Sequence, residues 1–119
     1  VDGWIDWNMV LDIQGGPNWF KNWCVAPVIV DTDKDEVYFT PLFYVLNHFS
    51  KFIRPGAKRI DFKNSDTQLP VTAAQNPDGS IAVVVLNMAE MSKNISVQIK
   101  SETVVYSIAP KAIQTIIIL

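Results

Sequence analysis

The sequence predicts a mainly β protein with one helix, divided near residue 55 into a helix-containing half and an all-β half. After Gly56, short runs of β-branched residues alternate with turn residues, which is typical of antiparallel sheets. Before Gly56, a single segment carries apolar residues at helical spacing. With 119 residues, of which 49% are hydrophobic, the chain is long enough to bury one core.

The first half opens with an apolar segment and a turn-rich loop. Residues 3–10 are predicted to form a buried strand, because Trp, Ile, Met and Val side chains dominate the segment. The sequence Gly-Gly-Pro-Asn at 15–18 then places residues 12–22 in a loop. We expect Trp4 to be a packing residue of the strand.

Two short strands with a polar turn between them follow the loop. Residues 27–30 predict an apolar strand, and residues 37–39 predict a strand that returns beside it. The intervening turn, 31–35, reads Asp-Thr-Asp-Lys-Asp and resembles the start of a calcium loop. It lacks the Gly and the Glu that complete such a loop, so we expect a solvated turn and no metal site.

A helix is predicted from Pro41 to about residue 52. Thr40 has the chemistry of an N-cap, and Pro41 suits the first helical position. Pro55 and Gly56 end the apolar pattern. His48 lies on this helix, and we expect it either on the helix surface or in a hydrogen bond to the β half.

The second half predicts an antiparallel β-sandwich. The sequence Asn-Pro-Asp-Gly at 76–79 is a hairpin signal, because Pro presets one turn dihedral and Gly supplies the positive one. Apolar and polar residues alternate over 97–108, as in a sheet with one face in water. The expected strands are 59–62, 71–75, 81–87, 94–99, 103–108 and 113–119.

Composition narrows the function classes. The net charge of −2 and the lack of a basic stripe argue against nucleic acid as a partner. The apolar runs are too short for a transmembrane helix. The single cysteine, Cys24, excludes an internal disulfide and is expected to be a small buried residue. No pattern predicts a cofactor or a metal, and the Trp-rich opening suggests a piece of a longer protein.

The four Trp residues of the chain gather near its start, among Asp and Asn residues. They lie in Gly3-Trp4-Ile5-Asp6-Trp7-Asn8, in Gln14-Gly15-Gly16-Pro17-Asn18-Trp19 and at Trp23. An aromatic ring covers the apolar face of a sugar, while amides and carboxylates bind its hydroxyls. The pattern therefore indicates carbohydrate recognition, although a Trp such as Trp7 is also a common core residue.

The segment GWIDWNMVLDIQGGPNW resembles the glucosylceramidase-type glycoside hydrolases of family 30. The resemblance continues through residues 26–31, 43–44, 48–53, 76–80 and 83–87, and therefore covers nearly the whole chain. It implies an antiparallel β-sandwich domain preceded by the last strand, active-site loop and helix of a (β/α)₈ barrel. Residues 1–56 would be the end of the barrel and residues 57–119 the sandwich.

The resemblance also implies a retaining β-glycosidase. Such an enzyme needs two carboxyl groups about 5–5.5 Å apart. In the family both are Glu residues on earlier barrel strands, and Glu36, Glu90 and Glu102 lie in no motif that resembles theirs. We therefore expect the chain alone to be inactive. Its partners would be a β-glucoside or glucosylceramide-like substrate and the remainder of the barrel.

The predicted substrate contacts are Trp7, Asn22, Trp23 and Asp6. The resemblance places the Trp7 indole and the Asn22 amide against the glucosyl unit, and puts Trp23 and Lys21 near the entrance. Asp6 either orients other site residues or bonds a neighbouring backbone. For Asn22 the alternative is an exposed loop residue, and for Trp23 it is packing. Asn18 is expected to be a turn residue.

A second function remains open, a non-catalytic β-sandwich that binds carbohydrate or serves as a scaffold. The resemblance allows a secreted, periplasmic or lysosomal location. An incomplete sandwich would leave an open sheet edge, so we expect self-association of the chain alone. Asn94-Ile95-Ser96 forms an N-glycosylation sequon.

Overall fold

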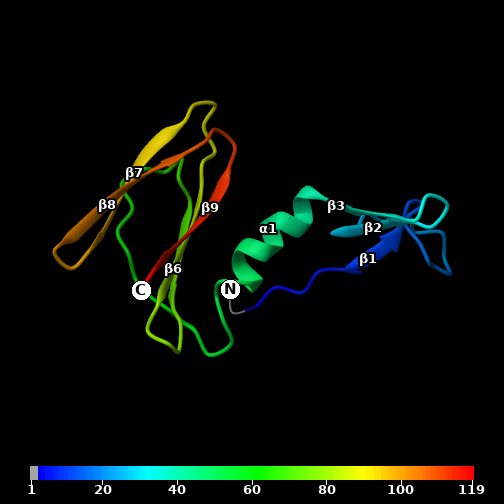
Figure 1. Cartoon of the computed structure of the whole chain (residues 1–119), viewed down its shortest axis with the longest axis horizontal. Coiled ribbons are helices and arrows are strands. Elements are labelled where there is room, and N and C mark those ends of the chain that lie inside the picture. The colour runs from blue at the N-terminus through cyan, green and yellow to red at the C-terminus, as the bar shows by residue number, and fades with distance from the viewer. Residues whose placement is uncertain (1–2) are drawn as a thin grey trace. The chain divides into compact units, whose positions relative to one another are not determined.

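The computed structural model describes residues 3–119, which divide into two compact units. The first unit ends at Asn47, and the second spans His48–Leu119. Figure 1 shows one short sheet in the first unit and two sheets in the second. Within residues 3–119 the fold is mainly β with a single helix, as the sequence predicts.

The first unit contains a three-stranded sheet in the order β1-β2-β3. The strand β1 (Val10–Asp12) pairs in parallel with β2 (Val28–Asp31), which pairs antiparallel with β3 (Glu36–Phe39). Leu11 is buried, with 3% of its surface exposed. Because β1 ends at Asp12, the loop that contains the Gly-Gly-Pro-Asn sequence begins directly after this strand.

The predicted strand at 3–10 is wrong for most of its length, because β1 begins only at Val10. A strand needs a neighbour for its backbone hydrogen bonds. Val10–Asp12 finds this neighbour in β2, whereas residues 3–9 pair with no strand in the described part of the chain. The expected packing of Trp4 is likewise not observed, because 75% of its surface is exposed.

The turn after β2 is organised by a buried Asp31 and is not fully solvated as the sequence predicts. The Asp31 carboxylate accepts hydrogen bonds from the backbone N–H groups of Asp33 and Lys34, both at 3.2 Å. The Lys34 ammonium lies 3.0 Å from its other oxygen. The hydrogen bond from Lys34 lowers the pKa of Asp31. Asp31 therefore closes the turn from β2 to β3.

The helix α1 (Pro41–Ser50) begins at the predicted residue and ends slightly earlier than expected. Thr40 precedes it, but its hydroxyl does not cap the helix. The hydroxyl donates instead to the backbone oxygens of Ala26 and Pro27, at 3.2 and 3.0 Å. These carbonyls lie just before β2, so Thr40 ties the helix start to the sheet of the first unit. Among the described residues no helix is long and apolar enough to cross a membrane.

The second unit packs a four-stranded antiparallel sheet against a two-stranded hairpin. The larger sheet has the order β4-β5-β6-β9, and the hairpin is β7-β8. The core between them includes Val83, Val85, Ile95, Ile108 and Ile116. The strand bounds are β4 Lys58–Arg59, β5 Val71–Gln75, β6 Ile81–Leu86, β7 Lys93–Ile99, β8 Glu102–Ile108 and β9 Ile113–Ile118.

The predicted hairpin turn between β5 and β6 is confirmed. Asn76 N–H donates to the Ser80 oxygen over 2.8 Å, and Gly79 has φ +89°. The Asn76 amide also donates to the Phe52 oxygen, at 3.0 Å, and accepts from the Arg54 N–H, at 3.0 Å. The turn thereby holds the segment that follows α1.

His48 makes the hydrogen bond to the β half that the sequence left open. Its Nδ1 lies 2.8 Å from the Thr115 hydroxyl on β9. His48 is half-buried, and the described residues contain no cluster of His, Cys, Asp and Glu that would hold a metal. The position of His48 therefore indicates a structural role.

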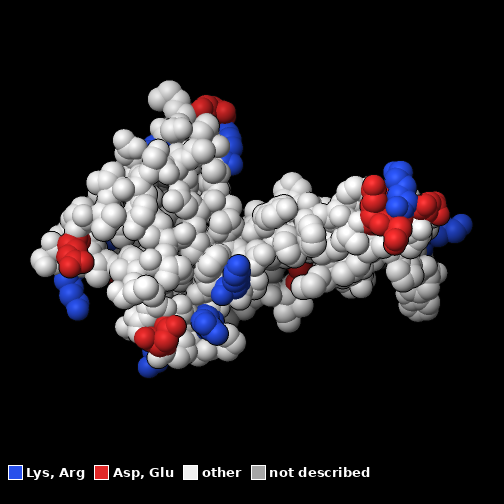
Figure 2. All heavy atoms as spheres, in the orientation of Figure 1, with Lys and Arg blue, Asp and Glu red and all other residues white. Residues whose placement is uncertain are grey.

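The two sheets of the second unit do not close fully against each other. A cavity of about 880 Å³ lies between them, lined by apolar residues of β5 and β6, by β7 and by the loop after β4. The strand β7 pairs only with β8 in the described part of the chain, so its other backbone edge is open. Figure 2 shows acidic and basic side chains in small, separate groups on a largely uncharged face.

Candidate functional site

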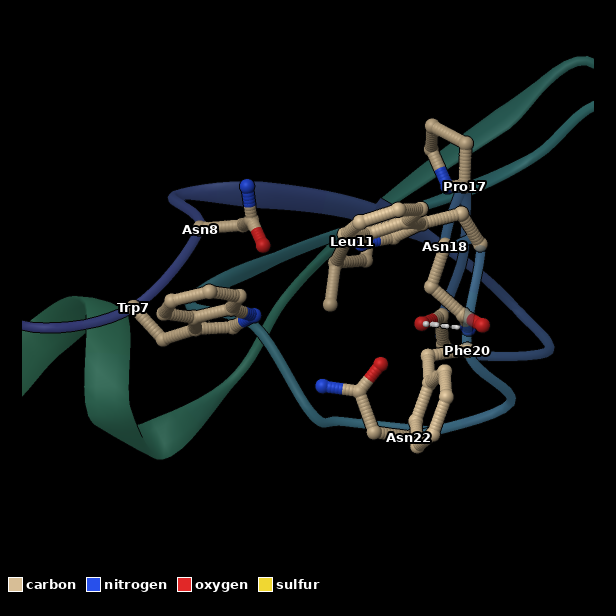
Figure 3. Close-up of a pocket in the computed structure, with 9 residues that line it drawn as sticks. Trp7, Asn8, Leu11, Pro17, Asn18, Phe20 and Asn22 are labelled. Atoms are coloured by element: carbon tan, nitrogen blue, oxygen red, sulfur yellow. Dashed lines mark hydrogen bonds between the residues drawn. The ribbon is translucent and has the colours of Figure 1, made fainter.

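A cavity of about 290 Å³ in the first unit is the candidate site. Its size is close to the lower end of small-molecule pockets, about 300 Å³. It lies around β1 and the loop that follows (Figure 3). Its lining combines aromatic rings with amide side chains: Trp7, Asn8, Leu11, Gly15, Pro17, Asn18, Trp19, Phe20 and Asn22.

Asp12, the last residue of β1, shapes the loop beside the cavity. Its carboxylate accepts hydrogen bonds from the N–H groups of Gln14 and Gly16, both at 2.8 Å. Its own N–H donates to the Gly16 oxygen over 2.7 Å. These three bonds fold the chain back on itself directly after the strand, as an Asx-type turn does.

Gly15 lets two parts of this loop approach each other. It is buried, has φ +84°, and lies so close to Cys24 that a Cβ would be 2.5 Å from the Cys24 oxygen. Only glycine fits both the backbone conformation and the space. The close approach brings residues 15–18 to the side of residues 22–24, and Asn22 borders the cavity as a result.

The predicted contacts Trp7 and Asn22 both line the cavity. Figure 3 shows the Trp7 ring and the Asn22 amide directed toward the same space, with Asn22 between Trp7 and Phe20. The Trp7 indole retains 67% of its surface exposed, so its face is available to a ligand. An exposed aromatic face beside an amide is the combination that binds a sugar ring.

Asp6 and Trp23, the other two predicted contacts, do not line the cavity. The Asp6 carboxylate accepts a hydrogen bond from the Trp7 backbone N–H at 2.8 Å, so it fixes the chain beside a lining residue. Trp23 is 60% exposed. Its neighbour Cys24 is half-buried, in contrast to the expected burial, and its thiol donates to the Asn22 oxygen over 3.2 Å.

Several lining residues are not among the four predicted contacts. Leu11 forms the floor from β1, whereas Trp19 and Phe20 come from the loop and are 97% and 83% exposed. Their aromatic character was a visible signal, but sequence reasoning does not show which side of a loop faces a cavity. Asn18 has the expected turn role, since its amide donates to the Gly15 oxygen at 3.4 Å. Its buried Oδ1 has no hydrogen-bond partner among residues 3–119.

Among the described residues, the lining contains aromatic and amide groups but no carboxylate, His or Lys side chain. It can therefore hold a polar ring, whereas acid–base chemistry needs titratable groups from elsewhere. Residues 1–53 match the glycosyl hydrolase family 30 TIM-barrel domain, and residues 56–116 match the family 30 beta sandwich domain. The chain belongs to glycosyl hydrolase family 30.

Relatives in this family include glucosylceramidases. The chain is 51% identical over 88 residues to lysosomal acid glucosylceramidase of Mus musculus, a match that covers 73% of the chain and 17% of the mouse protein. It is 40% identical to putative glucosylceramidase 2 of Caenorhabditis elegans over 124 residues, or 99% of the chain and 24% of that protein. The chain thus spans less than a quarter of the length of these two relatives.

Solved structures agree with the family 30 fold. SrfJ from Salmonella typhimurium superposes with a TM-score of 0.90 at 29% identity, covering 94% of the chain and 25% of that protein. An endo-β1,6-glucanase superposes with a TM-score of 0.84, also at 29% identity, over 92% of the chain and 25% of the glucanase. The β-sandwich that follows a barrel end is therefore the fold of this chain.

Proposed function

We propose that the chain is the C-terminal part of a retaining β-glucosidase that hydrolyses glucosylceramide-like lipids. Membership of family 30 supports a glycosidase, and the names of the mouse and nematode relatives support the glucosylceramidase type. In the proposed arrangement, residues 1–56 complete a catalytic (β/α)₈ barrel and residues 57–119 form the accompanying sandwich.

The observation that carries the proposal is the shared cavity of Trp7 and Asn22. Trp7 lies just before β1 and Asn22 lies in the loop that follows it. The loop after a barrel strand belongs to the catalytic face in this class of fold. The Trp7 ring would cover the apolar face of the glucosyl unit. The Asn22 amide would exchange hydrogen bonds with its hydroxyls.

The remaining predicted residues would act around this pair. Asp6 would position Trp7 through the bond to its backbone N–H. Trp23, which lies outside the cavity, would shape the entrance on the leaving-group side. The nucleophile and the acid/base carboxyl would come from preceding strands of the barrel, because the lining residues that the structure describes include no carboxylate.

Substitutions in the full-length enzyme test the proposal. We expect Trp7→Ala and Asn22→Ala each to lower kcat/KM for an aryl β-glucoside and for a short-chain glucosylceramide about ten- to a hundredfold. This corresponds to the loss of roughly 1–3 kcal/mol of stacking or hydrogen bonding. The melting temperatures of both variants should stay near that of the wild type.

Trp4→Ala is the matched control, because it removes an identical side chain that lies outside the cavity. Its folded fraction should keep the normal kcat/KM. If Trp7→Ala melted early and its folded fraction kept the normal rate, Trp7 would be a packing residue and the site assignment would be wrong. A full-length protein that bound β-glucosides without turnover would favour the non-catalytic carbohydrate-binding module.

A further inference from the structure

The sequon Asn94-Ile95-Ser96 lies on β7, and both its Asn and its Ser are exposed. Side chains of a strand point alternately to its two faces. Ile95 belongs to the buried core of the second unit, and Val97 packs against that core. Asn94 and Ser96 therefore lie on the opposite face, which is turned toward solvent.

The surroundings of Asn94 on this outer face are small and polar. Its partner across the hairpin is Ser107, which is also exposed. Ser96 lies opposite Val105, whose surface is 62% exposed. A further strand at the open edge of β7 would bond to its backbone and would leave this face uncovered. A bulky group on Asn94 would therefore meet no steric obstacle in the hairpin.

The Asn94 amide differs from other Asn amides of the second unit because it has no structural task. Asn64, Asn76 and Asn87 each donate their side-chain amide to a backbone oxygen. Within residues 3–119 the Asn94 side chain makes no hydrogen bond. Asn is also depleted in strands, so its place in β7 is not explained by strand propensity.

We propose that Asn94 is an N-glycosylation site when the protein passes through a eukaryotic secretory pathway. The co-reactant is an oligosaccharide linked to a lipid diphosphate. The Asn94 Nδ2 forms a bond to the anomeric carbon of the first sugar, the bond from that carbon to the diphosphate oxygen breaks, and the amide loses one proton. The lipid diphosphate leaves. Ser96 supplies the hydroxyl that completes the acceptor sequon.

Peptide mapping of the full-length protein, made in secretory eukaryotic cells and purified from their medium and secretory membranes, tests the site. Trypsin cleaves after Lys93 and after Lys100, and the peptide between these cuts contains Asn94 and no other Asn. We expect this peptide to carry an N-glycan. Peptide-N-glycosidase, applied to the denatured protein before trypsin, should release the glycan and convert Asn94 to Asp.

Three variants test whether glycosylation of Asn94 depends on the sequon. Asn94→Gln and Ser96→Ala should abolish the glycan on this peptide, whereas Ser96→Thr preserves the sequon and should retain it. Melting temperatures of the deglycosylated variants should match that of the deglycosylated wild type, because neither side chain contributes to the core. Recovery of the wild-type peptide entirely unmodified would overturn the proposal. The measurement does not depend on glycosidase activity, so its outcome is separate from that of the proposed function.

Discussion

The fully buried Asn87 donates a hydrogen bond from its side-chain amide to the backbone oxygen of Ala109 over 2.9 Å. The same amide donates to the Met91 oxygen at 2.8 Å, and its oxygen accepts from the Ala89 N–H at 2.9 Å. Asn87 follows β6, and Ala109 follows β8. One side chain therefore links the segment after β6, in the larger sheet, to the segment after β8, in the hairpin.

Asn87→Ala should destabilise the second unit by about 1–3 kcal/mol, because it leaves buried backbone groups without partners. Urea unfolding measures the change. Gln98→Ala, at an exposed position of β7, is the control and should stay within about 0.5 kcal/mol of the wild type. Equal stability of both variants would show that water replaces the Asn87 amide at no cost.

Acid should weaken the contact between Asp66 and Lys93. The hydrogen bond from Lys93, followed by that from the Gln68 N–H, lowers the pKa of Asp66. A carboxylate with a lowered folded-state pKa stabilises the fold above its unfolded pKa, which is about 3.9, and this contribution disappears as pH falls through the folded pKa. Asp66→Asn should therefore reduce stability at neutral pH and make the remaining stability less sensitive to acid below about pH 4.

The control for this pH dependence is Asp61→Asn. Asp61 is an exposed carboxylate of the same loop and has no ion-pair partner among the described residues. Urea unfolding from about pH 2 to about pH 7 compares the two variants with the wild type, and Asp61→Asn should not lose the ion-pair contribution that Asp66→Asn loses. An equal acid response of Asp66→Asn and the wild type would contradict a role of the ion pair.

Gly15→Ala should disrupt the candidate site. The new methyl group would lie 2.5 Å from the Cys24 oxygen and 2.7 Å from its nitrogen, and φ is +84°. Both contacts are with backbone, so the loop itself must move. We expect lower thermal stability and a lower kcat/KM in the full-length enzyme.

Gly79→Ala is the control for Gly15→Ala, because it introduces the strain of a positive φ without a steric clash. Gly79 has φ +89°, but no atom lies within 4 Å of the added Cβ. Its cost should be limited to the left-handed backbone strain of about 1–2 kcal/mol. The kcat/KM of the folded fraction should be unchanged. A Gly15→Ala variant that kept both normal stability and normal kcat/KM would contradict the close approach of the loop to Cys24.

The isolated chain should not hydrolyse an aryl β-glucoside. Binding groups such as Trp7 and Asn22 cannot replace a nucleophile and its acid/base partner. The measurement compares the purified chain with the full-length enzyme at equal concentration. Turnover that survived purification and disappeared on substitution of a residue of this chain would show that the catalytic groups are here.

Local chemistry in the sequence determines the hairpin at 76–79, the alternating strands after it and the helix start at Pro41. Each depends on residues within a few positions of one another, and the structure confirms all three. Few residue types favour a tight turn or the first position of a helix, so their occurrence in the sequence predicts these features well.

Only the tertiary structure decided which segments pair as strands, which groups Thr40 binds and which residues line the cavity. The segment 3–9 has strand composition, but without a paired neighbour only Val10–Asp12 becomes a strand. Thr40 has capping chemistry, yet carbonyls thirteen and fourteen residues earlier take its hydroxyl. The same holds for the cavity: Trp7 and Asn22 were visible in the sequence, whereas Leu11, Trp19 and Phe20 joined them only through the fold of the loop. A local pattern fixes the conformations that a segment prefers, but the free energy of pairing and burial depends on partners that only the folded chain brings together.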